Sequence, residues 1–229
     1  MRGLILGIAA IGLCGGSAAQ AADEAPICAD RPGKSTPTCT VPAGHFQLET
    51  GVADWSLDKA GGERDTSLAI GETLIRYGLT DHSDIQLDAT PWKRATSRGP
   101  GFHDSASGFG DVTVIYKHRA TPGNLPVQLA FYPYVKIPTA KRSLGNRKWE
   151  GGLLIPIDYA IPNSPLGINL TPEIDWVADA AGHGQHLAMV QVASLGWQAS
   201  DKLNFSADIW AQWDWDPAGT TRQAISGEQ

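Results

Sequence analysis

Hydrophobic and polar residues alternate with a period of two along most of the chain. In segment 84–90, for example, Ile85, Leu87 and Ala89 share one face, and polar residues take the other. Successive side chains of a strand point to opposite faces, so this pattern predicts strands with one apolar face. No comparable helical period is present. We predict about nine strands, at 46–53, 66–78, 84–90, 111–117, 127–137, 150–161, 168–176, 187–197 and 203–215.

The connections between these segments alternate in length. Short turns are expected near 79–83, 122–124, 162–164 and 200–202, and longer loops at 58–65, 93–109, 138–149 and 179–185. Outer-membrane barrels have short turns at one end and long loops at the other. A strand that crosses a bilayer at a tilt needs roughly 9–11 residues, which most of these segments provide. The sequence therefore predicts an all-β fold, an antiparallel transmembrane β-barrel.

The predicted number of strands is odd, although bacterial barrels usually have an even number. We expect ten or twelve strands in the complete barrel, about nine of them visible here. The residues after 215 then end in a loop, as in a chain truncated or divergent at its C-terminus.

Aromatic residues concentrate at the ends of the predicted strands. Such residues form two belts at the interfaces of a membrane barrel, whereas in a soluble protein they fill the core. Those before long loops are Trp55, Trp92, Trp176, Trp213 and Trp215, and those near short turns are Tyr77 and Trp197. Proline lacks the ladder donor, so we expect β-bulges at Pro133, Pro156 and Pro172.

The first residues have the form of a secretory signal peptide. Arg2 precedes the apolar run 4–13, and Ala19-Gln20-Ala21 has the small-x-small form of a cleavage site. We therefore divide the chain into a signal peptide at 1–21, a periplasmic N-terminal segment at 22–43 and a barrel at 44–229. The expected location is the cell outer membrane.

Cys28 and Cys39 remain after cleavage. An exported protein matures in an oxidising compartment, which favours a disulfide between them. The alternative is half of a metal site, for which the neighbourhood supplies no His or Cys partner.

Composition and motifs exclude several classes of protein. The net charge of −6 argues against nucleic-acid binding, which normally uses a basic face. The mean hydropathy of −0.18 excludes a bundle of membrane-spanning helices. Nucleotide-binding and hydrolase motifs are absent, so we predict no enzyme activity and no cofactor. His183 and His186 lack a third ligand nearby, so no metal site is predicted.

The polar faces of the predicted strands carry many acids and few bases. Facing the lumen of a barrel, they would either set selectivity for cations or simply fill and rigidify the interior. Glu72 and Arg76 are expected to pair with each other. The lumen-facing candidates are Glu49, Glu72, Arg76, Asp84, Asp88, Asp111, Lys117, Lys136, Glu150, Asp158, Glu173, Asp175, Asp208 and Asp214.

Two of the predicted long loops are basic. At the outer surface they would bind the phosphates of lipopolysaccharide or, alternatively, collect anionic aromatic solutes. The residues are Lys93, Arg94, Arg98, Lys141, Arg142, Arg147 and Lys148.

Several short motifs resemble a Gram-negative outer-membrane family named for the meta pathway of phenol degradation. The first two begin at the cysteines: Cys28-Ala-Asp-Arg-Pro-Gly-Lys and Cys39-Thr-Val-Pro-Ala-Gly. The others are Leu74-Ile-Arg-Tyr-Gly-Leu-Thr-Asp81, Ser107-Gly-Phe-Gly-Asp-Val112 and Tyr134-Val-Lys-Ile-Pro-Thr139. The resemblance spans about 28–215 and implies a β-barrel that passes small molecules, with aromatic compounds as candidates.

Three functions are consistent with these features. The first is an outer-membrane channel or transporter for small aromatic or hydrophobic solutes, with outer-membrane lipid and lipopolysaccharide as partners. The second is a secreted periplasmic β-sandwich or lipocalin-like binding protein, which would bury the apolar faces. The third is a plugged barrel with a structural role.

Overall fold

The computed structural model describes residues 27–31, 33–179, 184–200, 203–217, 219 and 221–228. The predicted signal peptide lies outside the described residues. The described part of the chain has no helix of the length and hydrophobicity that a bilayer crossing requires. Its strands are β1 Phe46–Thr50, β2 Ala53–Ala60, β3 Glu63–Ile70, β4 Thr73–Thr80, β5 Ser83–Ala89, β6 Trp92–Gly99, β7 Phe102–Gly108, β8 Val112–Arg119, β9 Val127–Ile137, β10 Glu150–Leu154, β11 Ile157–Ala160, β12 Leu166–Ala178, β13 Gln185–Ser200, β14 Leu203–Asp214 and β15 Thr221–Glu228.

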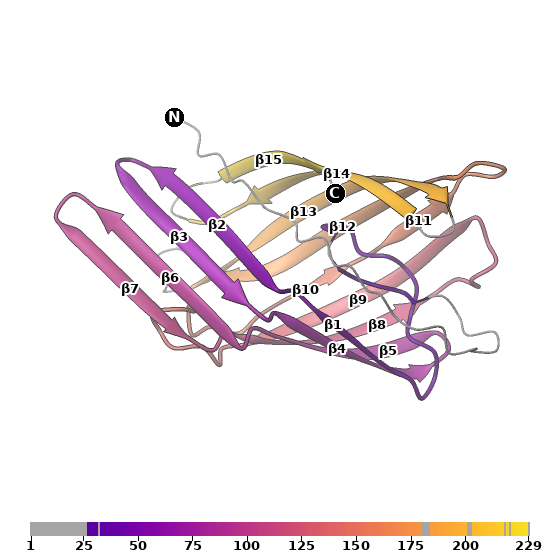
Figure 1. Ribbon diagram of the computed structural model, residues 1–229, viewed down its shortest axis with the longest axis horizontal. Helices are drawn as coiled ribbons and strands as arrows, with labels where there is room; N and C mark the ends of the chain where they lie inside the picture. The colour runs from indigo at the N-terminus through magenta and orange to yellow at the C-terminus, as the bar shows by residue number, and fades with distance from the viewer. Residues whose placement is uncertain are drawn as a thin grey trace.

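The strands form two antiparallel sheets (Figure 1). The main sheet has the order β1-β4-β5-β8-β9-β10-β12-β13-β14-β15, and β11 continues β10 between β9 and β12. The second sheet has the order β2-β3-β6-β7. Only two or three residues separate β1 from β2, β3 from β4, β5 from β6 and β7 from β8. The second sheet is therefore an extension of the first four long strands, and the described residues form ten long strands in all.

Two of the predicted long loops are wrong. Residues 58–65 belong to the β2–β3 hairpin, whose turn is Gly61-Gly62 with φ of 58° and 87°. Residues 93–109 belong largely to the β6–β7 hairpin, which turns at Gly101 with φ of 86°. Glycine adopts these left-handed angles without steric cost. The sequence pattern missed the hairpins because much of both faces is exposed, so apolar alternation is weak.

The expected proline bulges are also absent from the described strands. Pro133 and Pro172 lie inside β9 and β12 without a shift of register. Pro156 interrupts the strand between β10 and β11, but both halves keep one register with β12. Proline loses only its donor, and its carbonyl still accepts: Ala130 N donates to Pro156 O over 3.0 Å.

The residues expected to end in a loop form a strand. Residues 221–228 make β15, which pairs with β14 from Ala207↔Glu228 to Asp214↔Thr221. β1 and β15 are the two edges of the main sheet, and the described residues contain no ladder between them. The structure thus establishes an all-β antiparallel fold.

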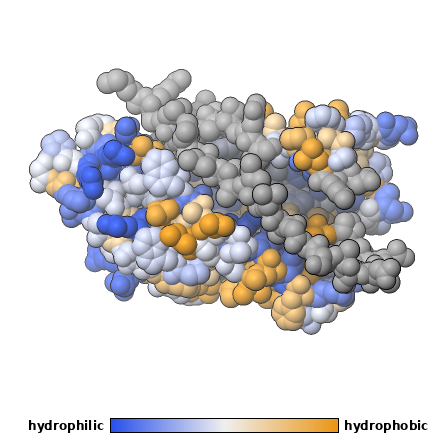
Figure 2. All heavy atoms as spheres, in the orientation of Figure 1, coloured by the Kyte–Doolittle hydropathy of each residue, from blue (hydrophilic) through white to orange (hydrophobic). Residues whose placement is uncertain are grey.

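Apolar side chains lie on the outer face of the main sheet, and polar ones on the inner face. Arg76, Lys117 and Asp84 are fully buried, whereas Ile209 is 62% exposed and its neighbour in the chain, Asp208, is buried. Figure 2 shows hydrophilic residues gathered at the two ends of the long axis, with apolar residues frequent between them. Apolar side chains outside and polar side chains inside are the reverse of the arrangement in a soluble domain.

Among the residues whose side chains the structure describes, the interior contains a small apolar cluster, made of Leu74, Ile115 and Tyr132. The rest of the inner space next to β4, β5 and β8 is taken by the segment 27–43, which enters along the concave side of the sheet (Figure 1). The segment joins the sheet at Gly78 of β4, which forms a parallel bridge with Ala43.

We predict that Gly78→Ala destabilises the fold and loosens segment 27–43. A Cβ at this position would lie 2.6 Å from the carbonyl oxygen of Val41 and would overlap that of Pro42. Backbone atoms cannot move aside, so the expected loss is about 1–3 kcal/mol of the free energy of unfolding. Urea unfolding measures this loss, and trypsin cleavage at Lys34 measures loosening. The control is Gly167→Ala in β12, whose Cβ would meet nothing nearer than 3.7 Å. Equal stability of the two variants would contradict the prediction.

Candidate functional site

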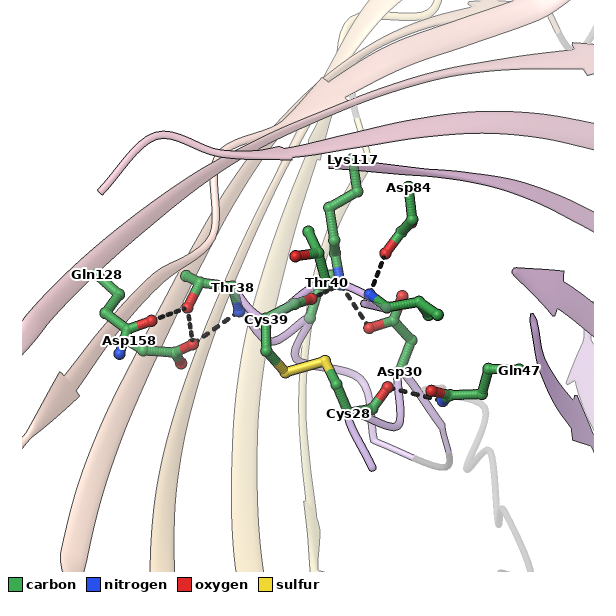
Figure 3. The surroundings of a disulfide bond; sticks show 12 residues. Cys28, Asp30, Thr38, Cys39, Thr40, Gln47, Asp84, Lys117, Gln128 and Asp158 are labelled. Carbon is green, nitrogen blue, oxygen red and sulfur yellow. Dashed lines mark hydrogen bonds and ion pairs between the residues drawn. A yellow bond between two sulfur atoms is a disulfide. The ribbon is translucent and has the colours of Figure 1, made fainter. Parts of the chain in front are cut away.

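Segment 27–43 is held inside the curled sheet by a disulfide and by polar side chains of many strands. Cys28 and Cys39 form the predicted disulfide, with a Cα–Cα distance of 5.9 Å. Figure 3 shows the bridge at the centre of the interior, with Lys117 and Asp84 on one side and Asp158 and Gln128 on the other. We call residues 27–43 the inner segment.

Two fully buried cations of the sheet share one carboxylate of the inner segment. Asp30 lies 2.6 Å from Nζ of Lys117 on β8 and 3.3 Å from the Arg76 guanidinium on β4. Arg76 also pairs with Glu49 of β1 at 3.2 Å and with Asp84 of β5 at 2.9 Å. An unpaired buried charge costs several kcal/mol, so these carboxylates are required for the two cations to be buried.

Backbone carbonyls of the two disulfide cysteines also accept hydrogen bonds from the same cations. Arg76 donates to the carbonyl oxygen of Cys28 over 2.5 Å, and Lys117 to that of Cys39 over 3.2 Å. Gln86 donates to Asp84 over 2.8 Å and accepts a hydrogen bond from the Tyr132 hydroxyl over 2.9 Å. The disulfide therefore presents its two carbonyls to the cations of β4 and β8.

Arg31 forms a second cluster beside the first. Its guanidinium pairs with Glu72 at 2.8 Å and with Asp88 at 3.3 Å. Burial opposes the charge of Arg31, but the ion pairs outweigh burial and raise its pKa above the ordinary value. The predicted pair of Glu72 with Arg76 is wrong, because Arg31 takes Glu72 and Arg76 binds Glu49, Asp84 and Asp30.

The opposite wall binds the inner segment mainly through its backbone. Asp208 of β14 accepts from Lys34 N over 3.0 Å, and Asp158 of β11 accepts from Thr38 N over 2.7 Å. Asn169 of β12 donates to the carbonyl of Thr36 over 2.8 Å. Together with Glu49 and Asp84, which accept backbone N–H groups of residues 30, 31 and 41, these side chains surround the segment.

Four of the predicted lumen acids, Glu49, Asp84, Asp158 and Asp208, thus accept hydrogen bonds from the backbone of a single segment. Carboxylates on β1, β5, β11 and β14 can do so only if the sheet curls around it. The inner segment narrows the interior where these carboxylates hold it. The carboxylates bind the segment and fix its position.

The other predicted lumen residues lie nearer the end of the main sheet that carries the long loop between β9 and β10, which we call the end with the long loops. Lys136 pairs with Glu150 and, at 3.4 Å, with Asp111, which also accepts a hydrogen bond from Ala140 N. The Tyr134 hydroxyl donates to Asp175 over 2.7 Å, and Glu173 lies two residues away on the same strand. Asp214 ends β14 and lies 2.6 Å from Nε2 of His186.

The basic residues occupy two kinds of structure. Lys93, Arg94 and Arg98 lie on strand β6, so their prediction as loop residues is wrong. The four from Lys141 to Lys148 lie in the connection between β9 and β10, as expected. An open cavity of about 540 Å³ brings Lys93, Lys136 and Arg142 together with Asp111.

The pattern of alternation missed the residues that the inner segment contributes. Asp30, Arg31 and Thr38 lie between or beside the cysteines and belong to no strand. The sequence shows that these polar residues lie within a disulfide loop, but it does not show which side chains of the strands they bind. Gln86 and Asn169 occupy inward positions of predicted strands but are uncharged, so they were not selected.

We predict that Asp30→Asn is strongly destabilising. It leaves Lys117 and Arg76 buried with one anion fewer, and removing one member of a buried ion pair costs about 3–5 kcal/mol. Urea unfolding at neutral pH measures the loss. The control is Asp58→Asn, at an exposed position of β2, which should change stability by less than about 0.5 kcal/mol. A loss as small as that of the control would show that Asp30 does not support the cations.

Comparison with known proteins gives one match. The family model described as "Putative MetA-pathway of phenol degradation" matches residues 29–220, which include residues 29–43 of the inner segment and the strands β1 to β14. No curated protein and no solved structure matches the chain. The matched region covers well over half of the sequence, and the chain therefore belongs to the family described as "Putative MetA-pathway of phenol degradation".

Proposed function

We propose that the protein is an outer-membrane β-barrel that passes small aromatic or hydrophobic solutes through a lumen narrowed by the inner segment. It is proposed to act without covalent chemistry and without a cofactor. The family's name supports a link to the metabolism of phenolic compounds. The solute class is inferred from this name.

The observation that carries the proposal is the outward apolar face of the main sheet. Ile85, Leu87, Ile174 and Ile209 are each more than two-fifths exposed, on strands whose opposite faces are polar. Water would penalise this surface, whereas the hydrocarbon core of a bilayer would accept it. A β-sandwich or lipocalin-like protein would have to bury these faces, so the exposed surface favours the barrel.

A bilayer also requires the two edges of the main sheet to be satisfied. Unpaired backbone groups in hydrocarbon cost several kcal/mol each, so only closed barrels cross a membrane with strands. We propose that β1 and β15 pair to close the sheet. Ten strands then give the even number that is usual for such barrels.

Exposed aromatic residues near both ends of the strands also support a barrel that crosses a bilayer. Trp197 and Phe205 stack at 5.6 Å near the β13–β14 turn, and Phe46 and Tyr77 contact each other at 4.5 Å near the β4–β5 turn. Trp176 lies near the other end of β12 and is 52% exposed. Two levels of exposed aromatic side chains fit two membrane interfaces.

The end with the long loops is proposed to face outward. Lys141, Arg142, Arg147 and Lys148 lie in the β9–β10 loop, and Lys93, Arg94 and Arg98 lie in the extended β6. Guanidinium and ammonium groups bind phosphate strongly. We propose that they bind the phosphates of lipopolysaccharide.

A structural barrel is the second candidate. The observation that favours it is the inner segment itself, which is fixed by buried ion pairs to β4 and β8 and by backbone hydrogen bonds to β11 and β14 on the opposite wall. Such a barrel would reach the membrane but pass no solute. Measurement of flux therefore separates the two functions.

We predict that Ile209→Arg destabilises the membrane-inserted protein by about 2–4 kcal/mol, the cost of a lipid-facing arginine at mid-bilayer. Leu203→Arg, on the same face of β14 but at its first residue, is the matched control and should cost only about 0–1 kcal/mol. Urea unfolding from lipid vesicles measures both losses, and recovery of the native protein in the outer-membrane fraction should accompany them. In a soluble protein both exposed positions would tolerate arginine equally, and this outcome would contradict the proposal.

We predict that loss of the disulfide raises the flux of solutes several-fold. Opening it frees a loop whose closure is worth about 3 kcal/mol, so the inner segment leaves the lumen more often. Swelling of proteoliposomes in benzyltrimethylammonium and in benzenesulfonate measures flux for Cys28→Ser/Cys39→Ser and for the wild type.

The control is a reducing agent, which should accelerate the wild type and leave the double variant unchanged. The acidic interior should favour the cationic probe. Flux in neither protein, with normal insertion, would contradict transport and support a structural barrel.

A further inference from the structure

We propose that Asp179, His186 and Asp216 bind a divalent transition-metal ion at the end of the barrel with the long loops. The site lies where β12 ends, where β13 begins and just after β14 ends, and it is separate from the inner segment. The proposal does not depend on solute transport or on membrane insertion.

The three proposed ligands and a neighbouring aspartate, Asp214, come from three different parts of the chain. Asp179 follows β12, His186 is the second residue of β13, and Asp214 and Asp216 are at and after the end of β14. The pairings Val177↔His186 and Ala188↔Asp214 place these ends side by side. The main sheet therefore brings one imidazole and three carboxylates to one point.

The distances suit a single ion. Nδ1 of His186 lies 2.9 Å from Oδ1 of Asp179 and 3.8 Å from Oδ2 of Asp216. All three candidate ligand atoms lie within 4.8 Å of one another. Around a tetrahedral zinc ion with bonds of about 2.1 Å, neighbouring ligand atoms are about 3.4 Å apart. The observed spacing needs only small movements of the side chains.

The buried imidazole has a carboxylate beside each ring nitrogen. The His186 side chain is only 7% exposed, with Oδ1 of Asp179 2.9 Å from Nδ1 and Oδ1 of Asp214 2.6 Å from Nε2. A histidine that binds metal through one nitrogen usually donates the other to a carboxylate. Asp214 lies at hydrogen-bonding distance from Nε2, so it is assigned as the positioning residue.

The charges of the cluster favour a cation. Three carboxylates surround one imidazole, and among the described residues no lysine or arginine lies within ion-pair distance of Asp179 or Asp214. The imidazole nitrogen is a borderline ligand and the two carboxylate oxygens are hard ligands, and this mixed set suits zinc or manganese better than calcium or magnesium, which prefer oxygen ligands alone. The sequence drew attention to His186 through His183, but the actual partners are Asp179, seven residues earlier, and Asp214 and Asp216, at the end of the next strand.

The experiment is titration of Zn²⁺ into the purified full chain, without a histidine tag and after treatment with a chelator, followed by calorimetry. We expect one equivalent of Zn²⁺ per chain and a rise in melting temperature. Asp214→Asn should weaken binding about 10–100-fold, as expected when the carboxylate partner of a ligand is removed. His186→Ala should abolish stoichiometric binding, and His103→Ala, at an exposed position of β7, should not affect it.

Circular dichroism and urea unfolding identify the variants that keep the native fold. If His186→Ala does not fold, Asp179→Asn and Asp216→Asn test the same site. Absence of stoichiometric binding to the wild type would overturn the proposal, since the cluster would then be a protonated imidazole among carboxylates. Binding that survives in every folded ligand variant would also overturn it.

Discussion

The burial of Arg76 and Lys117 is the constraint on which the interior depends. Both side chains are completely enclosed, and neither can be left without an anion in that environment. The strands supply Glu49 and Asp84 to Arg76, but the carboxylate shared by the two cations is Asp30, from outside the sheet. The inner segment is therefore part of the folded interior, and the disulfide fixes the loop that delivers Asp30 and two carbonyl groups.

The same constraint explains how the protein is stable with so small an apolar core. Leu74, Ile115 and Tyr132 cannot provide the burial of an ordinary domain of this length. The long ladders satisfy the backbone of the strands, and inward carboxylates satisfy the backbone of the inner segment. The apolar residues are left for the outer face, where a bilayer would remove them from water.

The sequence predicted the features that depend on neighbouring residues. Alternation located most strands and assigned faces correctly, as Asp84 and Ile85 illustrate. It failed where both faces have the same environment, as in the β6–β7 hairpin. It also failed where partners are distant: the pairing of Glu72 with Arg31 depends on the path of a segment without periodicity. The prediction of bulges at the prolines was wrong because a residue without a backbone donor can still keep the register of its strand.

The ion pairs also change what the acidic interior can do. Glu49, Asp84, Asp158 and Asp208 hold the inner segment, and Glu72 and Asp88 hold Arg31, so their charges are largely compensated. A count of inward acids therefore overstates the field that a passing solute would meet. Glu173 and Asp175 of β12, by contrast, take part in none of the ion pairs of the described residues. Selectivity for cations, if the lumen conducts, should arise beyond the inner segment and toward the long loops.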